Sequence, residues 1–321
     1  MEYRTLGKTG LRVSQMGFGC VSLGNEYGAL SDDEGTRTVL AAIDHGINFF
    51  DTSPYYGRTL SESRLGTALR GRRHEVVLAT KGGRFDAPLE TGFDFSYNGI
   101  ITMCEASLRR LQTDYFDVYQ LHDIEFGDKE QVVNEGIRAL HDLQQVGKVR
   151  FIGVTGYPLP LLRAMVETQT LDVTLSYCHY NLLNQQLNEV LVPAVQARGL
   201  GLINASVTHM GILTDQGPQD WHPAPRVIKE TAVRAAAYCR EQGVSLAQLT
   251  IQFALQNPHV DVTLLGARTH AELMSSLALL DAPLDTAILA DVQEILRPAV
   301  NLSWESGRPE HFEPGALAQE R

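Results

Sequence analysis

The stretch VVLATK, Val76–Lys81, is a short apolar run that ends in a charged side chain. Such a run is typical of a buried strand. Two other runs repeat the pattern: INFFD ends at Asp51 and DVYQLH ends at His122. The carboxyl ends of neighbouring parallel strands meet at one rim of a barrel. We therefore expect Asp51, Lys81 and His122 to converge there, together with Tyr56 from the loop after Asp51.

Short β-rich runs alternate with longer helical patterns, as in repeated βα units. Residues 3–14, YRTLGKTGLRVS, predict a preceding hairpin that plugs the barrel floor. The fold class is therefore α/β, a (β/α)8 TIM barrel with an N-terminal β-hairpin and a C-terminal extension, and we expect residues 1–321 to form a single domain. The eight strands are expected near Met16–Gly19, Ile47–Asp51, Val76–Lys81, Phe116–His122, Arg150–Thr155, Val173–Tyr177, Gly201–Ala205 and Thr263–Gly266.

Helices are expected over Asp33–Gly46, with Ser31 as a possible cap, and over residues 130–147. Two more are expected from Thr269 and near Asp285–Leu296. The Gly- and Pro-rich stretch Met210–Arg226 predicts a long loop beside the active site. The tail NLSWESGRPEHFEP, residues 301–314, lacks any periodicity.

Charge and composition point to a small-molecule partner. The net charge is −11 with no Lys/Arg tract, which argues against binding to nucleic acid or an anionic membrane. The chain lacks a signal-length apolar start and any run of roughly 18 apolar residues, so we expect a cytoplasmic protein. Its oligomeric state is not fixed by the sequence, and a monomer or a small homo-oligomer is expected. The four cysteines have no CxxC spacing and are expected to be free thiols: Cys20, Cys104, Cys178 and Cys239.

The four rim side chains suit proton transfer. The Lys81 ammonium needs an anion, which Asp51 supplies, and a neighbouring ammonium favours the phenolate of Tyr56, whose pKa is about 10 in isolation. Each residue alone has a plainer reading: the ion pair only joins two strand ends, the tyrosine only packs, and the histidine is structural. All four together favour general acid–base catalysis.

The segments DTSPYYG (51–57), ATKGG (79–83), YQLHD (119–123) and VRFIGVTG (149–156) resemble the aldo-keto reductase family. The resemblance covers essentially the whole chain. It implies that Tyr56 donates or accepts the proton, that Lys81 and Asp51 lower its pKa, and that His122 orients the substrate oxygen. It also implies a nicotinamide dinucleotide that lies across the rim of a barrel with a hairpin floor, without a Rossmann domain.

Cofactor contacts are expected from several loops, since no GxGxxG follows a first strand. LLGARTHAEL, residues 264–273, combines a strand end, a Gly turn and a helix start that can bind phosphate. Thr155 and Gly156 stand where many family members carry Ser-Asn, and Tyr177 can replace a missing stacking partner. We expect NAD rather than NADP, because the Glu272 carboxylate repels a 2′-phosphate. The candidate cofactor contacts are Thr155, Tyr177, Ser206, Gly266, Arg268, Thr269 and Glu272.

The resemblance is strongest to the aldose-oxidising branch of the family, through FFDTSPYYG, LHDIEFGD, LSYCHYN and NLSWESG. It implies oxidation of an aldose of the L-galactose, L-fucose or D-arabinose type at C1 to the lactone. The candidate substrate contacts are Tyr55, His209, Trp221, His222 and Trp304. Three alternatives stay open: an oxidoreductase acting on pyridoxal or another aldehyde, a cofactor-binding regulatory subunit, and a metal-dependent hydrolase. The last lacks an HxH pair, and we expect no metal.

Overall fold

Eight parallel strands close into a barrel in the order β10-β3-β4-β5-β6-β7-β8-β9, as seen in this computed structural model. The structure describes residues 1–85, 91–218 and 221–318. The predicted barrel is confirmed, and each predicted strand agrees within two residues at either end. The strands are β3 (Met16–Gly19), β4 (Phe49–Asp51), β5 (Val77–Gly82), β6 (Phe116–Leu121), β7 (Val149–Gly156), β8 (Val173–Tyr177), β9 (Gly201–Ala205) and β10 (Val262–Leu265).

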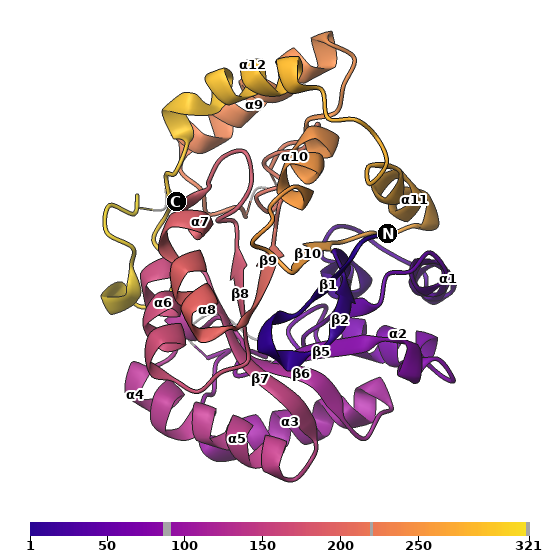
Figure 1. Cartoon of the computed structure of the whole chain (residues 1–321), viewed down its shortest axis with the longest axis vertical. Helices are drawn as coiled ribbons and strands as arrows, with labels where there is room; N and C mark the ends of the chain where they lie inside the picture. Colours follow the sequence, from indigo (N-terminus) through magenta and orange to yellow (C-terminus); the bar gives the residue numbers. More distant parts are fainter. Residues whose placement is uncertain (86–90, 219–220, 319–321) are drawn as a thin grey trace.

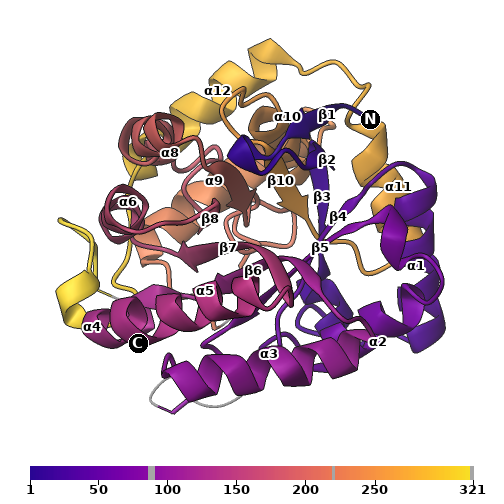
Figure 2. The same cartoon turned by 60° about the horizontal axis from the view of Figure 1, so that its bottom comes forward.

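Helices surround the barrel (Figures 1 and 2). The Ser31 hydroxyl accepts a hydrogen bond from the Glu34 N–H, so the predicted cap of the first helix is confirmed. The helix predicted over residues 130–147 is a composite whose middle part, Val132–Ile137, is a π-helix. The α-helices are α1 (Asp32–Asp44), α2 (Leu60–Ala68), α3 (Tyr97–Leu111), α4 (Lys129–Gln131), α5 (Arg138–Gln145), α6 (Leu159–Thr168), α7 (Gln186–Val190), α8 (Val192–Arg198), α9 (Arg226–Glu241), α10 (Leu246–Leu255), α11 (His270–Ala278) and α12 (Thr286–Leu296).

A hairpin closes the amino-terminal end of the barrel, as predicted. Strands β1 (Tyr3–Thr5) and β2 (Arg12–Ser14) pair antiparallel. Leu6, Leu11 and Val13 of this hairpin pack in one apolar cluster with residues of the barrel strands. Gly7 allows the close approach, because a Cβ there would lie 2.2 Å from the Gly201 nitrogen. Burial of these side chains against the strands favours the closed floor.

The chain after α11 covers one side of the barrel. Helix α12 packs against α9 at the top of the view in Figure 1. Beyond it, the indole of Trp304 stacks on Tyr157, with ring centroids 4.6 Å apart. Two donors of the tail bond the Glu125 carbonyl: the Arg308 N–H at 2.9 Å and the His311 Nδ1 at 2.8 Å. The tail therefore holds the loop that follows β6.

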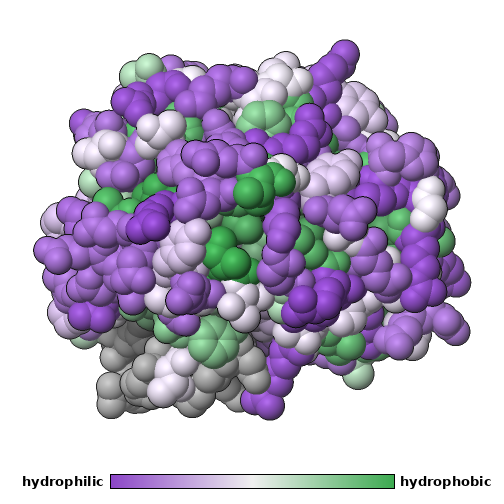
Figure 3. Space-filling view, turned by 90° about the horizontal axis from the view of Figure 1, so that it is seen from below, coloured by the Kyte–Doolittle hydropathy of each residue, from purple (hydrophilic) through white to green (hydrophobic). Residues whose placement is uncertain are grey.

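Buried thiols and a polar surface agree with the composition. The four cysteines are free and buried. In the face drawn in Figure 3, hydrophilic residues predominate and hydrophobic ones form smaller areas among them. Within the described ranges, the helices are all too short or too polar to cross a bilayer.

Candidate active site

The barrel brings the four candidate catalytic residues together at the carboxyl ends of β4, β5 and β6. Asp51 ends β4, Lys81 lies near the end of β5, and His122 directly follows β6. The Lys81 ammonium forms an ion pair with Asp51, donates to the Thr52 carbonyl at 2.9 Å and lies 3.3 Å from the Tyr56 hydroxyl. The amine, acid and phenol therefore form one connected group.

His122 completes the group from the other side of the phenol. Its ring stands edge-on to Tyr56, with centroids 5.8 Å apart. Its Nδ1 lies 3.0 Å from Ser53 Oγ, which leaves Nε2 as the nitrogen that can meet a substrate. Burial, aided by the charges of Lys81 and Arg84, lowers the pKa of His122 to about 3 and outweighs the opposing effect of Asp123. The ring is therefore neutral at physiological pH and can donate a hydrogen bond from Nε2.

The expected pKa of Tyr56 needs a correction. Burial raises the pKa of this phenol to about 12, and the opposing effect of Lys81 is smaller. Asp51 raises the pKa instead of lowering it, because its negative charge disfavours a phenolate. The ammonium therefore lowers the energetic cost of a transient phenolate without making the phenolate the resting state.

Two residues absent from the sequence prediction border the same site. Asp123 follows His122, and its Oδ2 lies 3.6 Å from His122 Nε2. The carboxylate pairs with the Arg84 guanidinium, which stacks over the Tyr55 ring at 3.5 Å from its centroid. Tyr55 therefore lies beside the four candidate catalytic residues Asp51, Tyr56, Lys81 and His122, which we call the tetrad. Its ring also contacts a charged side chain, that of Arg84. The signal for both was positional, since each lies within three residues of a predicted catalytic residue.

Two candidate cofactor contacts already have partners within the protein. Thr155 Oγ1 accepts from the Asp123 N–H at 3.0 Å, and the Tyr177 hydroxyl donates to Glu125 Oε1 at 3.0 Å. Burial, reinforced by the charge of Asp123, raises the pKa of Glu125 to about 8. A Cβ on Gly156 would lie 2.9 Å from Glu125 Oε2, so the glutamate fills the space beside this glycine. The sequence did not predict Glu125, which lies in a short 3-10 helix, Ile124–Phe126, after β6.

The predicted phosphate-binding segment begins helix α11, with Thr269 as its N-cap. The Glu272 carboxylate accepts from the Arg268 N–H at 2.8 Å and pairs with its guanidinium at 2.7 Å. Glu34 of α1 accepts from the His270 N–H at 2.9 Å. Two carboxylates therefore already accept hydrogen bonds from backbone N–H groups at the start of α11. Gly266 follows β10, and Ser206 follows β9 with a φ of 55°.

The other candidate substrate contacts form a separate cluster under the tail. His209, His222 and Trp304 are buried, and their rings contact one another with centroids 5.2 to 6.5 Å apart. His222 is fully engaged, because Nε2 bonds the His209 carbonyl and Nδ1 accepts from the Ala224 N–H. Trp221 stacks on His222 and is 55% exposed. The structure does not bring this cluster into ring contact with the tetrad.

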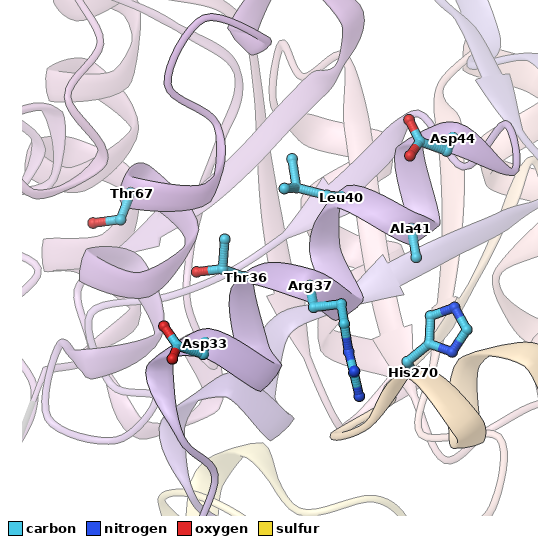
Figure 4. A pocket seen from close by; sticks show the side chains of 8 residues that line it. All are labelled: Asp33, Thr36, Arg37, Leu40, Ala41, Asp44, Thr67 and His270. Atoms are coloured by element: carbon cyan, nitrogen blue, oxygen red, sulfur yellow. The ribbon is translucent and has the colours of Figure 1, made fainter.

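A surface groove of about 670 Å³ lies away from the tetrad (Figure 4). It is lined by Asp33, Thr36, Arg37, Leu40, Ala41 and Asp44 of α1, Thr67 of α2 and His270 of α11. None of the four candidate catalytic residues lines it.

The comparisons agree with this geometry. A family model described as the aldo/keto reductase family matches residues 15–297, and the chain belongs to that family. It is an oxidoreductase of the kind that uses a nicotinamide dinucleotide. The chain is 42% identical to L-galactose dehydrogenase of Arabidopsis thaliana over 96% of this chain and 98% of the relative. It is 30% identical to D-threo-aldose 1-dehydrogenase of a Pseudomonas species, over 89% and 94%. An aldo-keto reductase of Bacillus halodurans, in its holo form, superposes with a TM-score of 0.77 at 27% identity, covering 98% of this chain and all of the other.

Proposed function

We propose that this enzyme oxidises an aldose at its anomeric carbon, producing the aldonolactone and reduced NAD. The proposal rests on the contact of the buried Lys81 ammonium with the partly buried Tyr56 hydroxyl, beside a neutral His122. That arrangement suits removal of a proton from a substrate hydroxyl. The names of the similar relatives, L-galactose dehydrogenase and D-threo-aldose 1-dehydrogenase, support an aldose as the substrate.

The chemistry follows from the residues at the rim. A bound nicotinamide dinucleotide would supply the acceptor for the hydride of C1. Tyr56 takes the proton of the anomeric hydroxyl, and Lys81 stabilises the phenolate that performs this step. His122 donates a hydrogen bond from Nε2 to the same oxygen as it becomes a carbonyl. The C–H and O–H bonds of the substrate are thus exchanged for one C=O bond.

NAD is the proposed cofactor because of the charges at the start of α11. A free 2′-hydroxyl can donate to a carboxylate, whereas a 2′-phosphate there would meet Glu272 and Glu34. Arg268 is paired with Glu272, which reduces what it can offer a phosphate. In this proposal Tyr177, at the end of β8, would hold the nicotinamide end of the cofactor, and Arg268 and Thr269 would hold its adenosine end.

A cofactor-reduction screen over aldoses and pyridoxal, with NAD and with NADP, tests the proposal. We expect L-galactose to be the fastest substrate, with L-fucose and D-arabinose slower or comparable. These sugars share the configuration nearest C1. Glucose oxidised as fast as all three would contradict the assignment, and so would pyridoxal oxidised faster than every aldose. Turnover well below roughly 1 per second on every compound would favour a regulatory subunit.

A further inference from the structure

Asp123 occupies a fixed position beside the place where the reacting oxygen binds, if the proposed function is right. Because His122 Nδ1 faces Ser53, the substrate oxygen must approach Nε2, and Asp123 Oδ2 lies 3.6 Å from that nitrogen. The Asp123 backbone has a φ of 54°, a left-handed conformation that costs energy for a non-glycine residue. Thr155 Oγ1 holds this turn by accepting the Asp123 N–H at 3.0 Å.

Arg84 also holds the carboxylate. Its guanidinium pairs with Asp123 Oδ2 and lies over the Tyr55 ring, and the centroid of the Phe93 ring is 5.3 Å away. An arginine carries five N–H donors, so a bond to Asp123 leaves others to offer. Burial disfavours the ionised form of Asp123, but the bonded Arg84 guanidinium favours it and keeps the pKa of this carboxyl below its usual value. The pair is therefore a fixed acceptor next to a fixed donor.

A sugar supplies the groups that fit such a pair. The ionised carboxylate only accepts hydrogen bonds. In a cyclic aldose, C1 is bonded to the ring oxygen and to C2. The ring oxygen has no hydrogen to donate, whereas the hydroxyl on C2 has one. The tetrad itself engages only the oxygen on C1, which every alcohol, aldehyde or hemiacetal substrate shares. Recognition of the neighbouring carbon must come from other side chains at the rim.

We propose that the Asp123–Arg84 pair binds the C2 hydroxyl of the aldose, with Asp123 accepting its hydrogen and Arg84 donating to its oxygen, and so selects 2-hydroxy sugars. The Tyr55 ring carries the guanidinium and supplies an apolar wall for the adjacent carbons. The pair determines specificity, whereas Tyr56 takes the proton and His122 donates a hydrogen bond to the reacting oxygen.

The test compares kcat/KM for D-arabinose and 2-deoxy-D-ribose, which is the same pentose without its C2 hydroxyl. The wild-type enzyme should prefer D-arabinose by about 10- to 100-fold, the value of a hydrogen bond to a charged group. Asp123→Asn should lower that ratio towards one, mainly by slowing D-arabinose. Arg84→Lys changes a less buried side chain and should reduce the ratio as well. If Asp123→Asn does not fold, the result for Arg84→Lys decides the test.

Asp128→Asn is the matched control. Asp128 is an exposed carboxylate in the same connection between β6 and α4, and its side chain caps α4. It should keep the wild-type ratio. A wild-type ratio of the two kcat/KM values near one would overturn the proposal. The proposal would also be overturned if both variants kept the wild-type ratio while their overall rates fell, because that result indicates a structural role. If the wild-type enzyme oxidises no aldose, the proposed function fails as well. If it oxidises aldoses with a ratio that stays unchanged in the variants, only the role of this pair fails.

Discussion

Tyr56 experiences two opposing influences, burial and the charge of Lys81. Burial disfavours the phenolate and the ammonium favours it, so removing the ammonium must raise the pKa of Tyr56 further above its value of about 12. Oxidation requires the deprotonated form, so its rate increases with pH. We predict that Lys81→Met shifts the rise of kcat/KM for aldose oxidation to higher pH. An unchanged pH profile would mean that Lys81 only joins two strands.

Glu125 offers a prediction about stability. Its pKa in the folded state is about 8, above its ordinary value near 4.5, because the carboxyl is buried beside Asp123. A raised folded pKa contributes stability below pH 4.5 that is lost as the pH rises to 8. One pKa unit is worth about 1.4 kcal/mol. The free energy of unfolding of Glu125→Gln, relative to that of the wild type, should therefore rise by roughly 2 to 4 kcal/mol between pH 5 and pH 8.

Urea unfolding at both pH values measures this difference. The control is Glu130→Gln, which changes an exposed carboxylate on α4 in the same way. A difference between wild type and Glu125→Gln that is the same at pH 5 and pH 8 would show that Glu125 is ionised in the folded protein.

At the residue scale, the sequence predicted Asp51, Lys81 and His122 because they lie at or beside the ends of strands, whose position in a parallel barrel is determined by the fold. Tyr56 was predicted from the loop that follows the first of these strand ends. Asp123, Arg84 and Glu125 were not predicted. Their environment depends on how loops from different strands meet, such as Arg84 after β5 reaching Asp123 after β6. The predicted shift in the pKa of Tyr56 was wrong in direction. Burial raises this pKa by more than Lys81 lowers it, and the extent of burial is not visible in the sequence.

Among the elements, the start of α11 makes the clearest prediction. Glu272 neutralises Arg268 and bonds its N–H, so the wild-type enzyme should use NAD at least about tenfold better than NADP. Glu272→Gln removes the charge and releases the guanidinium, which should raise relative use of NADP. We expect the matched change Glu294→Gln, an exposed partner of Arg297 on α12, to have no such effect. NADP preference in the wild type, measured as kcat/KM for each cofactor, would refute the role of Glu272.

The strands and the four helices that the sequence predicted are present in the structure, with one informative difference. Helix α11 and helix α12 begin after Thr269 and Asp285, whose side chains cap them in the structure. The helix over residues 130–147 was predicted from its apolar spacing, but that spacing does not reveal the π-helical part at Val132–Ile137. A π-turn changes the hydrogen-bond register without removing the apolar face, so periodicity alone cannot distinguish it.

For the whole molecule, closure of the barrel turns separate strand ends into one site. Residues 51, 81 and 122 are far apart along the chain, yet β4, β5 and β6 are consecutive neighbours in the barrel. The hairpin closes the opposite end and leaves the carboxyl-terminal rim for substrate and cofactor. The tail contributes by bonding the loop that carries Glu125, close to the Asp123–Arg84 pair.

The most direct measurement is kcat/KM for NAD-dependent oxidation of L-galactose by the wild-type enzyme and by Tyr56→Phe, with NAD binding measured in parallel. We predict a loss of about 10²- to 10⁴-fold in the variant, because only the proton acceptor is removed. The dissociation constant for NAD should stay unchanged. A variant that keeps more than half of the wild-type rate would contradict the assignment of Tyr56 as the catalytic phenol.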